Sequence, residues 1–592
     1  MEFPRTCQKF FFFLSFLFYF LKLSVASFAQ EEFATAYFAD YQVSETADVS
    51  CDLQITIKNR LENIFLGEYA LTLGINHISD LEVSDNFGPL TPIVETGENR
   101  TKIQVKFKQN VIGKNKENRL KIHFQTPDFA AINGQVLEIS IPGLAKNEQF
   151  LDYQTKLIIP GKFGPASFME PKPAKEESNL NRRVYWYTKE SLVKNEGISA
   201  SFGDKQIFDF KLTYELQNPA GEKKTYEIVL PADTSTQQIF YEQIQPKPEQ
   251  IITDADDNWL ARFTLSPKSN LTVWASGSAQ IFLKKQTGFD RKLTDKNKEN
   301  YLARQMYWEV DDPQIKQLAG QLETPEGIYQ WIVANLTYDY NRFNLPLARH
   351  GASWTLEHKS ASLCSEFTDL FVTLCRAAGI PAREVNGFAY TSNSKLRPLS
   401  LTKDILHAWP QYWDSEQALW IDVDPTWENT TGGINFFHRL DLNHFAFVRH
   451  GMASNYPLSP GSYGLGDTKT IQVTFGQKKT YSQEVTFKPQ LPISVIAGFP
   501  IKGQIQVHNS GQGAYHDQKI SLKTADSTRE FKVTVLPPYG EIDLPIISKT
   551  GWLEKGNYLI EVKFSGQEVT YTVQVIPIYD FIRLWLTHLW KF

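Results

Sequence analysis

Cys364 stands at the start of an apolar stripe with helical spacing, where a thiol can be activated. Apolar residues recur at helical intervals from Phe367 to Ala378, and Gly379 with Pro381 ends the pattern as a C-terminal cap. The unpaired N–H groups and the dipole of a helix N-terminus stabilise a thiolate, and the same groups can form part of an oxyanion hole. The position predicts a nucleophile, although a buried core cysteine fits the pattern of this segment as well.

A thiolate nucleophile needs an imidazole that shares its proton and a group that orients the imidazole. His407 opens one of two strand-like segments joined by a short turn. Pairing about a turn centred between Ser415 and Glu416 places His407 directly opposite Asp424, with Cβ atoms ~5 Å apart. A carboxylate there can accept the second N–H and fix the tautomer. A slip of two residues gives that role to Asp422, and a surface His-Asp contact is the plain alternative.

The N-terminus has the three parts of a secretory signal peptide. Arg5 and Lys9 precede an apolar run from Phe10 to Leu21, and Ser27-Phe28-Ala29 resembles a cleavage site. The run is short for a membrane span, which needs about 20 residues. An uncleaved anchor is the alternative, and in both cases the body of the protein is exported, secreted or associated with the cell envelope.

The other cysteines of the exported part indicate core positions. Cys375 lies on the same stripe, about 16 Å from Cys364 in a straight helix and too far for a disulfide. Cys51 falls on the apolar face of an alternating segment, 51–58. So few cysteines in a long exported chain do not form a disulfide scaffold.

Composition and patterning indicate several globular domains rich in β-structure. The chain has 592 residues, 42% hydrophobic and 21% charged, with a net charge of -5. Acids and bases are interspersed, which argues against a nucleic-acid partner. Period-2 alternation dominates except after residue 310, where Asp312-Pro313 and Thr324-Pro325 start helical patterns. The predicted parts are a signal peptide (1–29), an N-terminal β domain (30–160), a linker (161–194), a second β domain (195–300), a catalytic domain (301–455), an immunoglobulin-like β domain (468–576) and an amphipathic C-terminal helix (577–592).

Two smaller features of the sequence each have two possible interpretations. The acidic cluster 254–258 lacks the spacing of a calcium loop and predicts a hairpin turn. On a helix, Ile578, Phe581, Trp585 and Leu589 share one face. This face suits a membrane surface, contacted through residues 578–592, or docking on the last β domain.

Four stretches of the sequence together resemble the transglutaminase-like superfamily. They are 331–339, 364–383, 407–409 and 420–426, and the resemblance covers about residues 310–430. It implies an α+β papain-like or transglutaminase-like core, flanked here by N-terminal β-sandwich domains and the C-terminal immunoglobulin-like sandwich. It also implies that Cys364 is the nucleophile, His407 the base and acid, and Asp424 the residue that orients the imidazole.

The sequence departs from the family pattern near the predicted site. Relatives often have Gly where Ser362 stands, and Val-Glu where Pro410-Gln411 follows the His-Ala-Trp run. Gln411 removes a charge beside the site, and Trp409 and Gln411 are possible accessory residues. The side-chain oxyanion donor of the family is not evident. Trp354 is one candidate, and the backbone N–H of Cys364 is the safer one.

These observations predict an extracytoplasmic thiol enzyme of the transglutaminase-like kind. It would act on peptide or protein amides through an acyl-thioester on Cys364. Hydrolysis, as in a cysteine-dependent peptidase or amidase, is favoured over cross-linking because no lysine-specific acceptor pocket is evident. The alternative is a non-catalytic envelope scaffold or adhesion protein that uses the same fold. No cofactor and no metal are expected, since no metal-ligand spacing is present.

Overall fold

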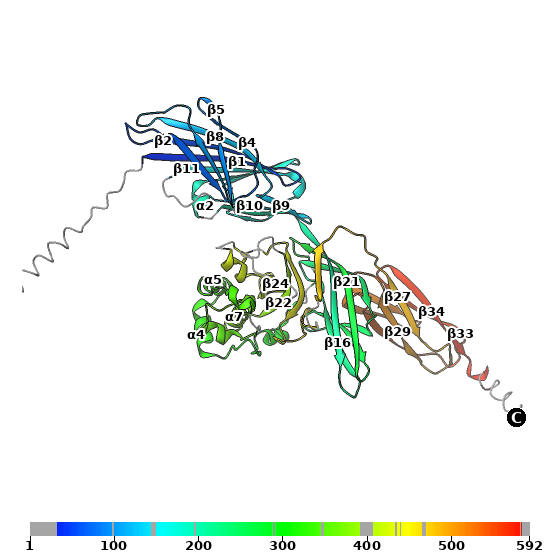
Figure 1. The fold of residues 1–592 in the computed structure, drawn as a ribbon. Coiled ribbons are helices and arrows are strands. Elements are labelled where there is room, and N and C mark those ends of the chain that lie inside the picture. The colour runs from blue at the N-terminus through cyan, green and yellow to red at the C-terminus, as the bar shows by residue number, and fades with distance from the viewer. Residues whose placement is uncertain are drawn as a thin grey trace, which may run out of the picture. The chain divides into compact units, whose positions relative to one another are not determined.

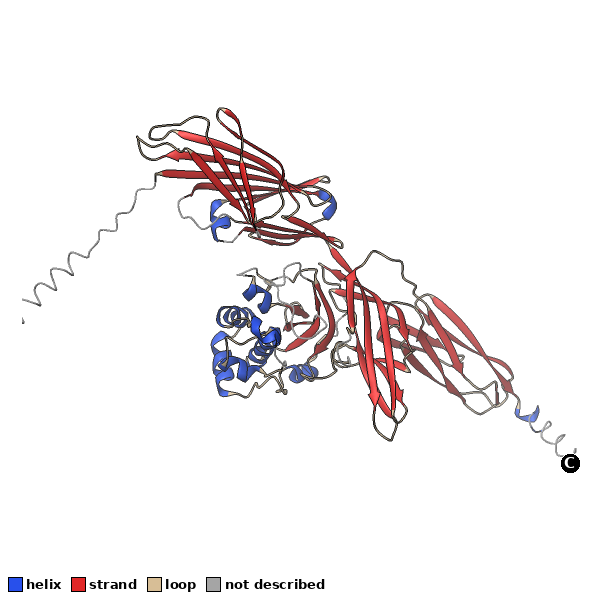
Figure 2. Ribbon diagram, viewed as in Figure 1, coloured by secondary structure: helices blue, strands red, loops and turns tan. Residues whose placement is uncertain are grey.

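The computed structural model describes most of the chain, and the described part divides into two compact units (Figures 1 and 2). The described residues of the first unit lie within 32–131, 139–162 and 171–198, and those of the second lie within 132–138, 163–170 and 199–582. The predicted signal peptide and most of the predicted C-terminal helix lie outside the described residues. The described residues are 32–97, 100–143, 150–194, 197–286, 288–289, 292–344, 348–390, 406–431, 435–438, 440–463, 469–580 and 582.

The first unit is built on an eight-stranded sheet with the order β13-β14-β11-β1-β2-β8-β4-β5 and a three-stranded sheet with the order β3-β7-β6. Alternation along β2 buries every second side chain, so Cys51 is a core residue between Tyr41 and Phe124 on the neighbouring strands. The prediction for Cys51 is therefore confirmed. The elements of this unit are β1 (Phe33–Val43), β2 (Val49–Asn59), β3 (Glu68–Leu73), β4 (Ser79–Asp85), β5 (Gly88–Leu90), β6 (Ile93–Gly97), β7 (Arg100–Lys106), β8 (Glu117–Thr126), β11 (Phe150–Pro160), β13 (Lys175–Ser178), β14 (Arg182–Tyr187) and α2 (Lys189–Lys194).

The predicted linker at 161–194 is wrong, because this segment is folded into the first unit. Strand β14 pairs with β11, with Tyr185 opposite Leu157, and β13 pairs with β14 in turn. Val184, Tyr185 and Tyr187 are buried. The proline- and charge-rich residues around β14 masked its short apolar alternation in the sequence. Strands β9 (Ala130–Asn133), β10 (Val136–Pro142), β12 (Ala166–Glu170) and β15 (Gly197–Phe202) lie where the chain passes between the two units.

The second unit begins with the predicted second β domain, which forms two sheets. Their orders are β18-β21-β16-β26 and β17-β20-β19. Strand β26 comes from beyond the helical region and pairs with β16, with Val473 opposite Phe210. The predicted boundary at residue 468 is therefore wrong, since β26 completes the preceding sheet. The strands are β16 (Lys205–Asn218), β17 (Lys224–Leu230), β18 (Gln237–Gln245), β19 (Gln250–Thr253), β20 (Trp259–Leu265), β21 (Ser269–Phe282) and β26 (Ile471–Phe475).

The acidic cluster forms the turn between β19 and β20. The Asp254 carboxylate accepts hydrogen bonds from the backbone N–H groups of Asp256 at 2.9 Å and Asn258 at 2.8 Å. Asp side chains stabilise turns in this way, and the predicted hairpin turn is confirmed.

Helices and a four-stranded sheet form the region around Cys364 and His407. The sheet order is β24-β23-β22-β25, and α4, α5 and α7 lie together beside it (Figure 1). The side chains of Asp312 and Thr324 accept hydrogen bonds from the first turns of α4 and α5, so both predicted helix starts are confirmed. The elements are α3 (Asp295–Lys298), α4 (Pro313–Leu322), α5 (Pro325–Asn335), α6 (Ala352–Glu357), α7 (Cys364–Ala377), α8 (Pro425–Thr430), β22 (Ala382–Ala389), β23 (His407–Asp414), β24 (Leu419–Asp422) and β25 (His444–His450).

The C-terminal part is a sandwich of a three-stranded and a five-stranded sheet around an aliphatic and aromatic core. The sheet orders are β27-β29-β32 and β28-β34-β33-β30-β31. Its strands are β27 (Val485–Gln490), β28 (Ser494–Ile496), β29 (Ile501–Asn509), β30 (Tyr515–Lys523), β31 (Thr528–Leu536), β32 (Glu541–Ser548), β33 (Gly556–Phe564) and β34 (Gln567–Ile576).

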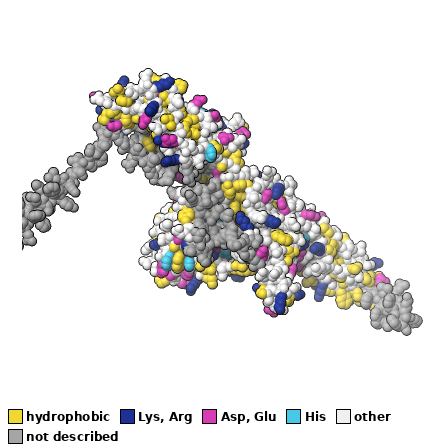
Figure 3. Space-filling model, in the orientation of Figure 1, with side chains coloured by type: hydrophobic (Ala, Val, Ile, Leu, Met, Phe, Trp, Pro, Cys, Tyr) yellow, Lys and Arg dark blue, Asp and Glu magenta, His cyan; other side chains and the backbone are white. Residues whose placement is uncertain are grey.

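Charge is mixed over the described surface that faces the viewer in Figure 3, where Lys and Arg side chains alternate with Asp and Glu. Among the described residues, no helix is long and apolar enough to cross a bilayer.

Candidate active site

Cys364 is the first residue of α7, a helix that is buried along almost its entire length. The backbone N–H of Leu363 donates to the Glu366 carboxylate at 2.9 Å, and Arg342 lies 3.2 Å from the same carboxylate. These contacts fix the first helical turn, and the Cys364 side chain has no exposed surface. The predicted placement of Cys364 at a helix N-terminus is confirmed, and Cys375 is a core residue of the same helix, also as predicted.

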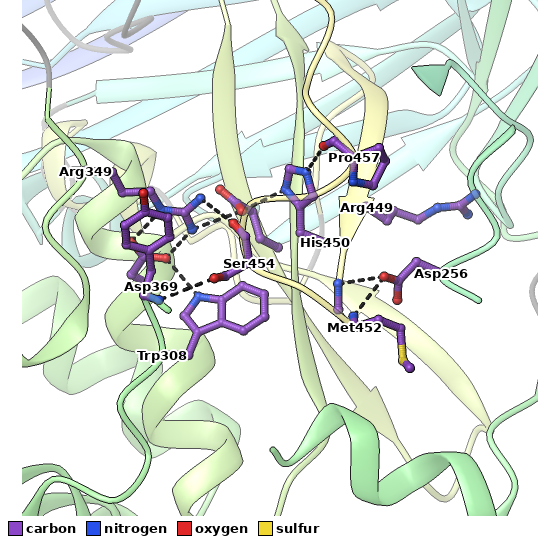
Figure 4. A network of polar contacts seen from close by, with 12 residues as sticks. Asp256, Trp308, Arg349, Asp369, Arg449, His450, Met452, Ser454 and Pro457 are labelled. Atoms are coloured by element: carbon purple, nitrogen blue, oxygen red, sulfur yellow. Dashed lines mark hydrogen bonds and ion pairs between the residues drawn. The ribbon is translucent and has the colours of Figure 1, made fainter. Parts of the chain in front are cut away.

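A buried ionic cluster ties α7 to the sheet (Figure 4). Arg349 pairs with Asp369 of α7 and lies 3.0 Å from Glu384 of β22. Glu384 also contacts Nδ1 of His450 at 3.0 Å, and the indole of Trp308 donates to Asp369 at 2.9 Å. A guanidinium that is 20% exposed and satisfies two buried carboxylates holds its partners in one geometry. The cluster therefore sets the position of the helix that carries Cys364 against the strands that carry the imidazoles.

His407 is the first residue of β23, and its Nε2 lies 2.9 Å from Oδ2 of Asp424. Both side chains are completely buried. The other oxygen of Asp424 accepts the backbone N–H of Trp427 at 3.0 Å, so the same carboxylate caps α8. Because the cap fixes one oxygen, the other is aimed at the imidazole.

The hairpin register differs from the predicted one. Gln411 pairs with Asp422 and Asp414 with Leu419, so Asp424 is not the residue opposite His407. The turn is centred one residue later than predicted, between Glu416 and Gln417, and the Asp414 carboxylate accepts two backbone N–H groups within it. Strand β24 ends at Asp422, and the chain then bends into α8. The choice of Asp424 as the partner is confirmed, but the pairing argument behind it is wrong.

The electrostatics of the pair favour a protonated imidazole. Burial opposes the imidazolium, but the charge of Asp424, its hydrogen bond with the ring and the nearby Cys364 thiol outweigh it and raise the pKa of His407 to about 9. Burial likewise opposes the Asp424 carboxylate, and the histidines beside it hold its pKa well below the usual range. Among the described residues, Nδ1 of His407 has no partner in standard hydrogen-bond geometry. The Cys364 thiol lies close enough to the imidazole to contribute to the raised pKa of His407.

Asp422, the alternative partner, has a different role. Its Oδ1 accepts the indole N–H of Trp409 at 3.0 Å and the amide of Gln411 at 2.7 Å. Gln411 in turn accepts from Nε of Arg383 at 2.7 Å. An amide can donate to Asp422 and accept from Arg383 at once, which a carboxylate cannot do. This explains Gln411 as the bridge of a buried network beside the site.

The predicted accessory residues differ in where they lie. The ring of Trp409 packs 5.9 Å from the ring of His407. Trp354 lies on α6, stacked between His350 and His358 at 4.1 and 4.3 Å. The structure thus gives Trp354 a place in a separate aromatic stack, and the oxyanion donor stays a prediction.

A second histidine, His444, lies at the start of β25 and was not predicted as a site residue. Its Nε2 lies 3.3 Å from the Asp424 oxygen that contacts His407, and its Nδ1 lies 2.8 Å from Asp441. Strand β22 separates the two histidine strands and pairs with both, with Gly387 opposite His407 and Ala389 opposite His444. Two histidines that each open a strand are visible in the sequence. The strand order that brings them together is not.

The ligand atoms of His407, Asp424 and His444 lie within 4.8 Å of one another, which is a spacing that a cation could also adopt. We interpret the group as a hydrogen-bonded chain, because the imidazoles contact Asp424 at 2.9 and 3.3 Å. The expected absence of a metal stays a prediction.

Comparison with known proteins identifies this region. Residues 310–425 match the model of the Transglutaminase-like superfamily, and the match includes Cys364, His407 and Asp424. This part of the chain is a transglutaminase-like domain, as the sequence resemblance implied. His444 lies beyond the matched segment.

The similar proteins cover only parts of the chain. A protein-glutamine gamma-glutamyltransferase from Pseudomonas aeruginosa is 30% identical over 128 residues, which are 20% of this chain and 19% of that protein. A solved structure from Cytophaga hutchinsonii, described provisionally as a cysteine protease, has 17% identity and a TM-score of 0.30, covering 46% of this chain and 86% of that one. An M1 zinc metallopeptidase from Deinococcus radiodurans has 11% identity and a TM-score of 0.20, covering 33% of this chain and 45% of its own.

Proposed function

We propose that this protein is a thiol enzyme that acts on peptide or protein amides through an acyl-thioester on Cys364. The observation that carries the proposal is the buried set of Cys364 at a helix start, His407 beside it and Asp424 hydrogen bonded to His407 at 2.9 Å. A nucleophile, a base and a group that orients the base are the parts that covalent acyl transfer needs.

The reaction has two steps. Sγ of Cys364 attacks the amide carbonyl carbon, the C–N bond breaks, and His407 gives the proton from the thiol to the leaving amine. Water then attacks the thioester, His407 accepts a proton from it, and the carboxylic acid leaves as the thiol is restored. Hydrolysis is favoured over transfer to an amine, because the sequence offers no lysine-specific acceptor pocket. The similarity to a gamma-glutamyltransferase makes a glutamine carboxamide one candidate donor.

Alkylation of Cys364 tests the catalytic claim without a known substrate. The full chain is treated with iodoacetamide at neutral pH, and the labelled residue is identified by mass spectrometry. Labelling of Cys364 is expected to be at least ~10-fold slower in a His407→Ala variant. Cys375→Ser is the matched control and leaves labelling at Cys364 unchanged. Equal rates in the wild type and His407→Ala would sink the proposal.

The fate of the acyl group separates hydrolysis from cross-linking. Casein is incubated with the protein and a fluorescent primary amine. New peptide termini, or glutamate in place of glutamine, indicate hydrolysis, whereas fluorescent casein indicates transfer to the amine. A Cys364→Ser variant should do neither.

A second candidate is a non-catalytic scaffold or adhesion protein, and one observation favours it. Cys364, His407 and Asp424 have no exposed surface, whereas a catalytic thiol must meet its substrate. A Cys364 that resists alkylation until the protein unfolds would favour this candidate.

The proposed setting is outside the cytoplasm, with an extracytoplasmic protein or peptide as substrate and membrane contact through residues 578–592. The signal-like N-terminal sequence supports export. Fractionation of cells that express the chain with and without residues 578–592 tests the membrane contact. An unchanged distribution would exclude it.

A further inference from the structure

The Asp424 carboxylate holds two imidazoles on one oxygen. Nε2 of His407 lies 2.9 Å and Nε2 of His444 lies 3.3 Å from Oδ2. Asp441 lies 2.8 Å from the remaining nitrogen of His444. Carboxylates and imidazoles therefore alternate through the buried core, from Asp441 to His407 and on to Cys364.

The same two indoles fix both imidazoles. The ring of Trp427 lies 4.6 Å from His444 and 5.2 Å from His407. The ring of Trp409 lies 5.0 Å from His444 and 5.9 Å from His407. Aromatic rings packed on two sides leave an imidazole little rotational freedom. Both histidines are thus held at fixed angles to the carboxylate between them.

The two histidines have different partners, and this separates their chemistry. His407 has Asp424 on one nitrogen and the Cys364 thiol as its other polar contact, so it can exchange a proton. His444 has a carboxylate on each nitrogen, and donating to both requires that both nitrogens carry hydrogen. Burial opposes this charge, but Asp441 and Asp424 raise the pKa of His444 to about 9. The imidazole of His444 is therefore positively charged at neutral pH and keeps both of its protons.

We propose that His444, held by Asp441, is a positioning residue that fixes the Asp424 carboxylate for the His407 proton exchange. The inference rests on the proposed function of the triad. A carboxylate buried with one imidazole alone would keep unsatisfied acceptor capacity and could rotate about its cap. His444 is a second, immobile donor to Oδ2, so it prevents this rotation of Asp424. Its positive charge also balances the buried carboxylate of Asp441.

Two conservative variants separate positioning from a purely structural role. In His444→Gln the amide nitrogen falls close to the place of Nε2, so it can still donate to Asp424. In His444→Asn the amide falls close to the place of Nδ1, so it can reach Asp441 but not Asp424. Both variants remove the cation and leave a polar group. They differ in the contact that the proposal requires.

The readout is alkylation of Cys364 in the full chain between pH 6 and 10, with neutral iodoacetamide and anionic iodoacetate. The imidazolium attracts only the anion, so the ratio of the two rates falls when His407 loses its proton. The charged groups that face His444 are Asp441 before β25, Asp424 at the start of α8 and His407 on β23. In His444→Gln the rate ratio is expected to fall at higher pH than in the wild type. The variant loses the positive charge of residue 444, which disfavours a second positive charge on His407, and keeps the hydrogen bond to Asp424. Iodoacetamide rates should stay within ~3-fold of the wild type in His444→Gln and drop at least ~10-fold in His444→Asn.

Each outcome bears on one claim. Equal rates in the wild type and His444→Asn, or equal losses in both variants, would overturn the positioning role. An equal fall of the thermal midpoint in His444→Gln and His444→Asn, with alkylation rates that differ as expected, supports positioning. A difference in stability then does not explain the difference in rate. A wild-type Cys364 that reacts no faster than in His407→Ala would instead refute the proposed function, on which the inference depends.

Discussion

His407 and Asp424 are hydrogen bonded at 2.9 Å although they do not face each other in the β23–β24 hairpin. The hairpin ends two residues before Asp424, and the bond forms because Asp424 caps α8 with its other oxygen. The orientation of the catalytic imidazole thus depends on a helix N-cap, and disturbing the cap should disturb the imidazole.

Asp424→Asn should lower the pKa of His407 and weaken catalysis together. Asn keeps a cap for α8, but it removes the charge that raises the pKa of His407 to about 9. Burial of the ring remains and favours the neutral form, so the imidazolium should be lost at lower pH. We expect a loss of about 10²- to 10⁴-fold in turnover, by analogy with triad aspartates. The iodoacetate-to-iodoacetamide rate ratio locates the shift.

Asp422→Asn is the matched control. Asp422 shares the hairpin and accepts from Trp409 and Gln411. In Asp422→Asn the iodoacetate-to-iodoacetamide rate ratio should still fall close to pH 9. A larger shift in this variant than in Asp424→Asn would reassign the orienting role to Asp422.

The local chemistry of the site could be predicted because single elements encode it. A helical stripe with a cap pair placed Cys364 at a helix start, and a strand–turn–strand pattern brought the segments of His407 and Asp424 together. The register was wrong because the turn lies one residue later than predicted, where Asp414 accepts two backbone N–H groups, and spacing alone does not reveal this.

Contacts between distant segments could not be predicted from the sequence. His444 reaches Asp424 only through the order of strands in the sheet, and β26 completes a sheet whose other strands precede the helical region. Strand β14 was not predicted, because the prolines and charged residues on either side of its short apolar segment suggested a linker. In each case the deciding interaction joins residues that no local pattern relates.

Arg349→Ala should strongly destabilise the second unit. The variant leaves the Asp369 and Glu384 carboxylates, which have 0% and 1% exposed surface, without their guanidinium. Removing one partner of a buried ion cluster costs about 3 to 5 kcal/mol. Urea denaturation followed by tryptophan fluorescence measures the loss, because Trp308 donates to Asp369 in the same cluster.

Lys316→Ala provides the comparison for Arg349→Ala. Lys316 pairs with Asp311 at 3.6 Å, and their side chains are 59% and 64% exposed. Exposed ion pairs contribute little to stability, so the denaturation midpoint should not move measurably. Equal midpoints for the two variants would show that the Arg349 cluster does not hold α7 on the sheet.

The stability of the second unit should fall as the pH rises from about 6.5 to about 9. His407 and His444 both have their pKa raised to about 9 in the folded protein, against about 6.5 in an unfolded chain. Groups with a raised folded-state pKa contribute stability that is complete below the unfolded value and lost above the folded one. Urea midpoints at pH 6, 8 and 10 check this. His444→Gln should show a smaller decrease between pH 6 and 10 because one of the two groups is gone, and an unchanged decrease would contradict the assignment.

Two Gly→Ala substitutions should have opposite effects on stability. A Cβ at Gly387 of β22 would overlap the carbonyl oxygen of Phe445 and lie 3.0 Å from the Trp409 ring. Overpacking of this kind costs about 1 to 3 kcal/mol, and it would move apart the strands that carry His407 and His444. Gly320 of α4 has nothing within 4 Å of its Cβ position, so alanine there should stabilise the helix by about 0.4 to 1 kcal/mol. Denaturation gives both signs, and Cys364 alkylation should slow only in Gly387→Ala. A Gly387→Ala protein with wild-type stability and alkylation rate would show that the strands tolerate separation, and that the close approach of β22 and β25 is not what sets the geometry of the two imidazoles.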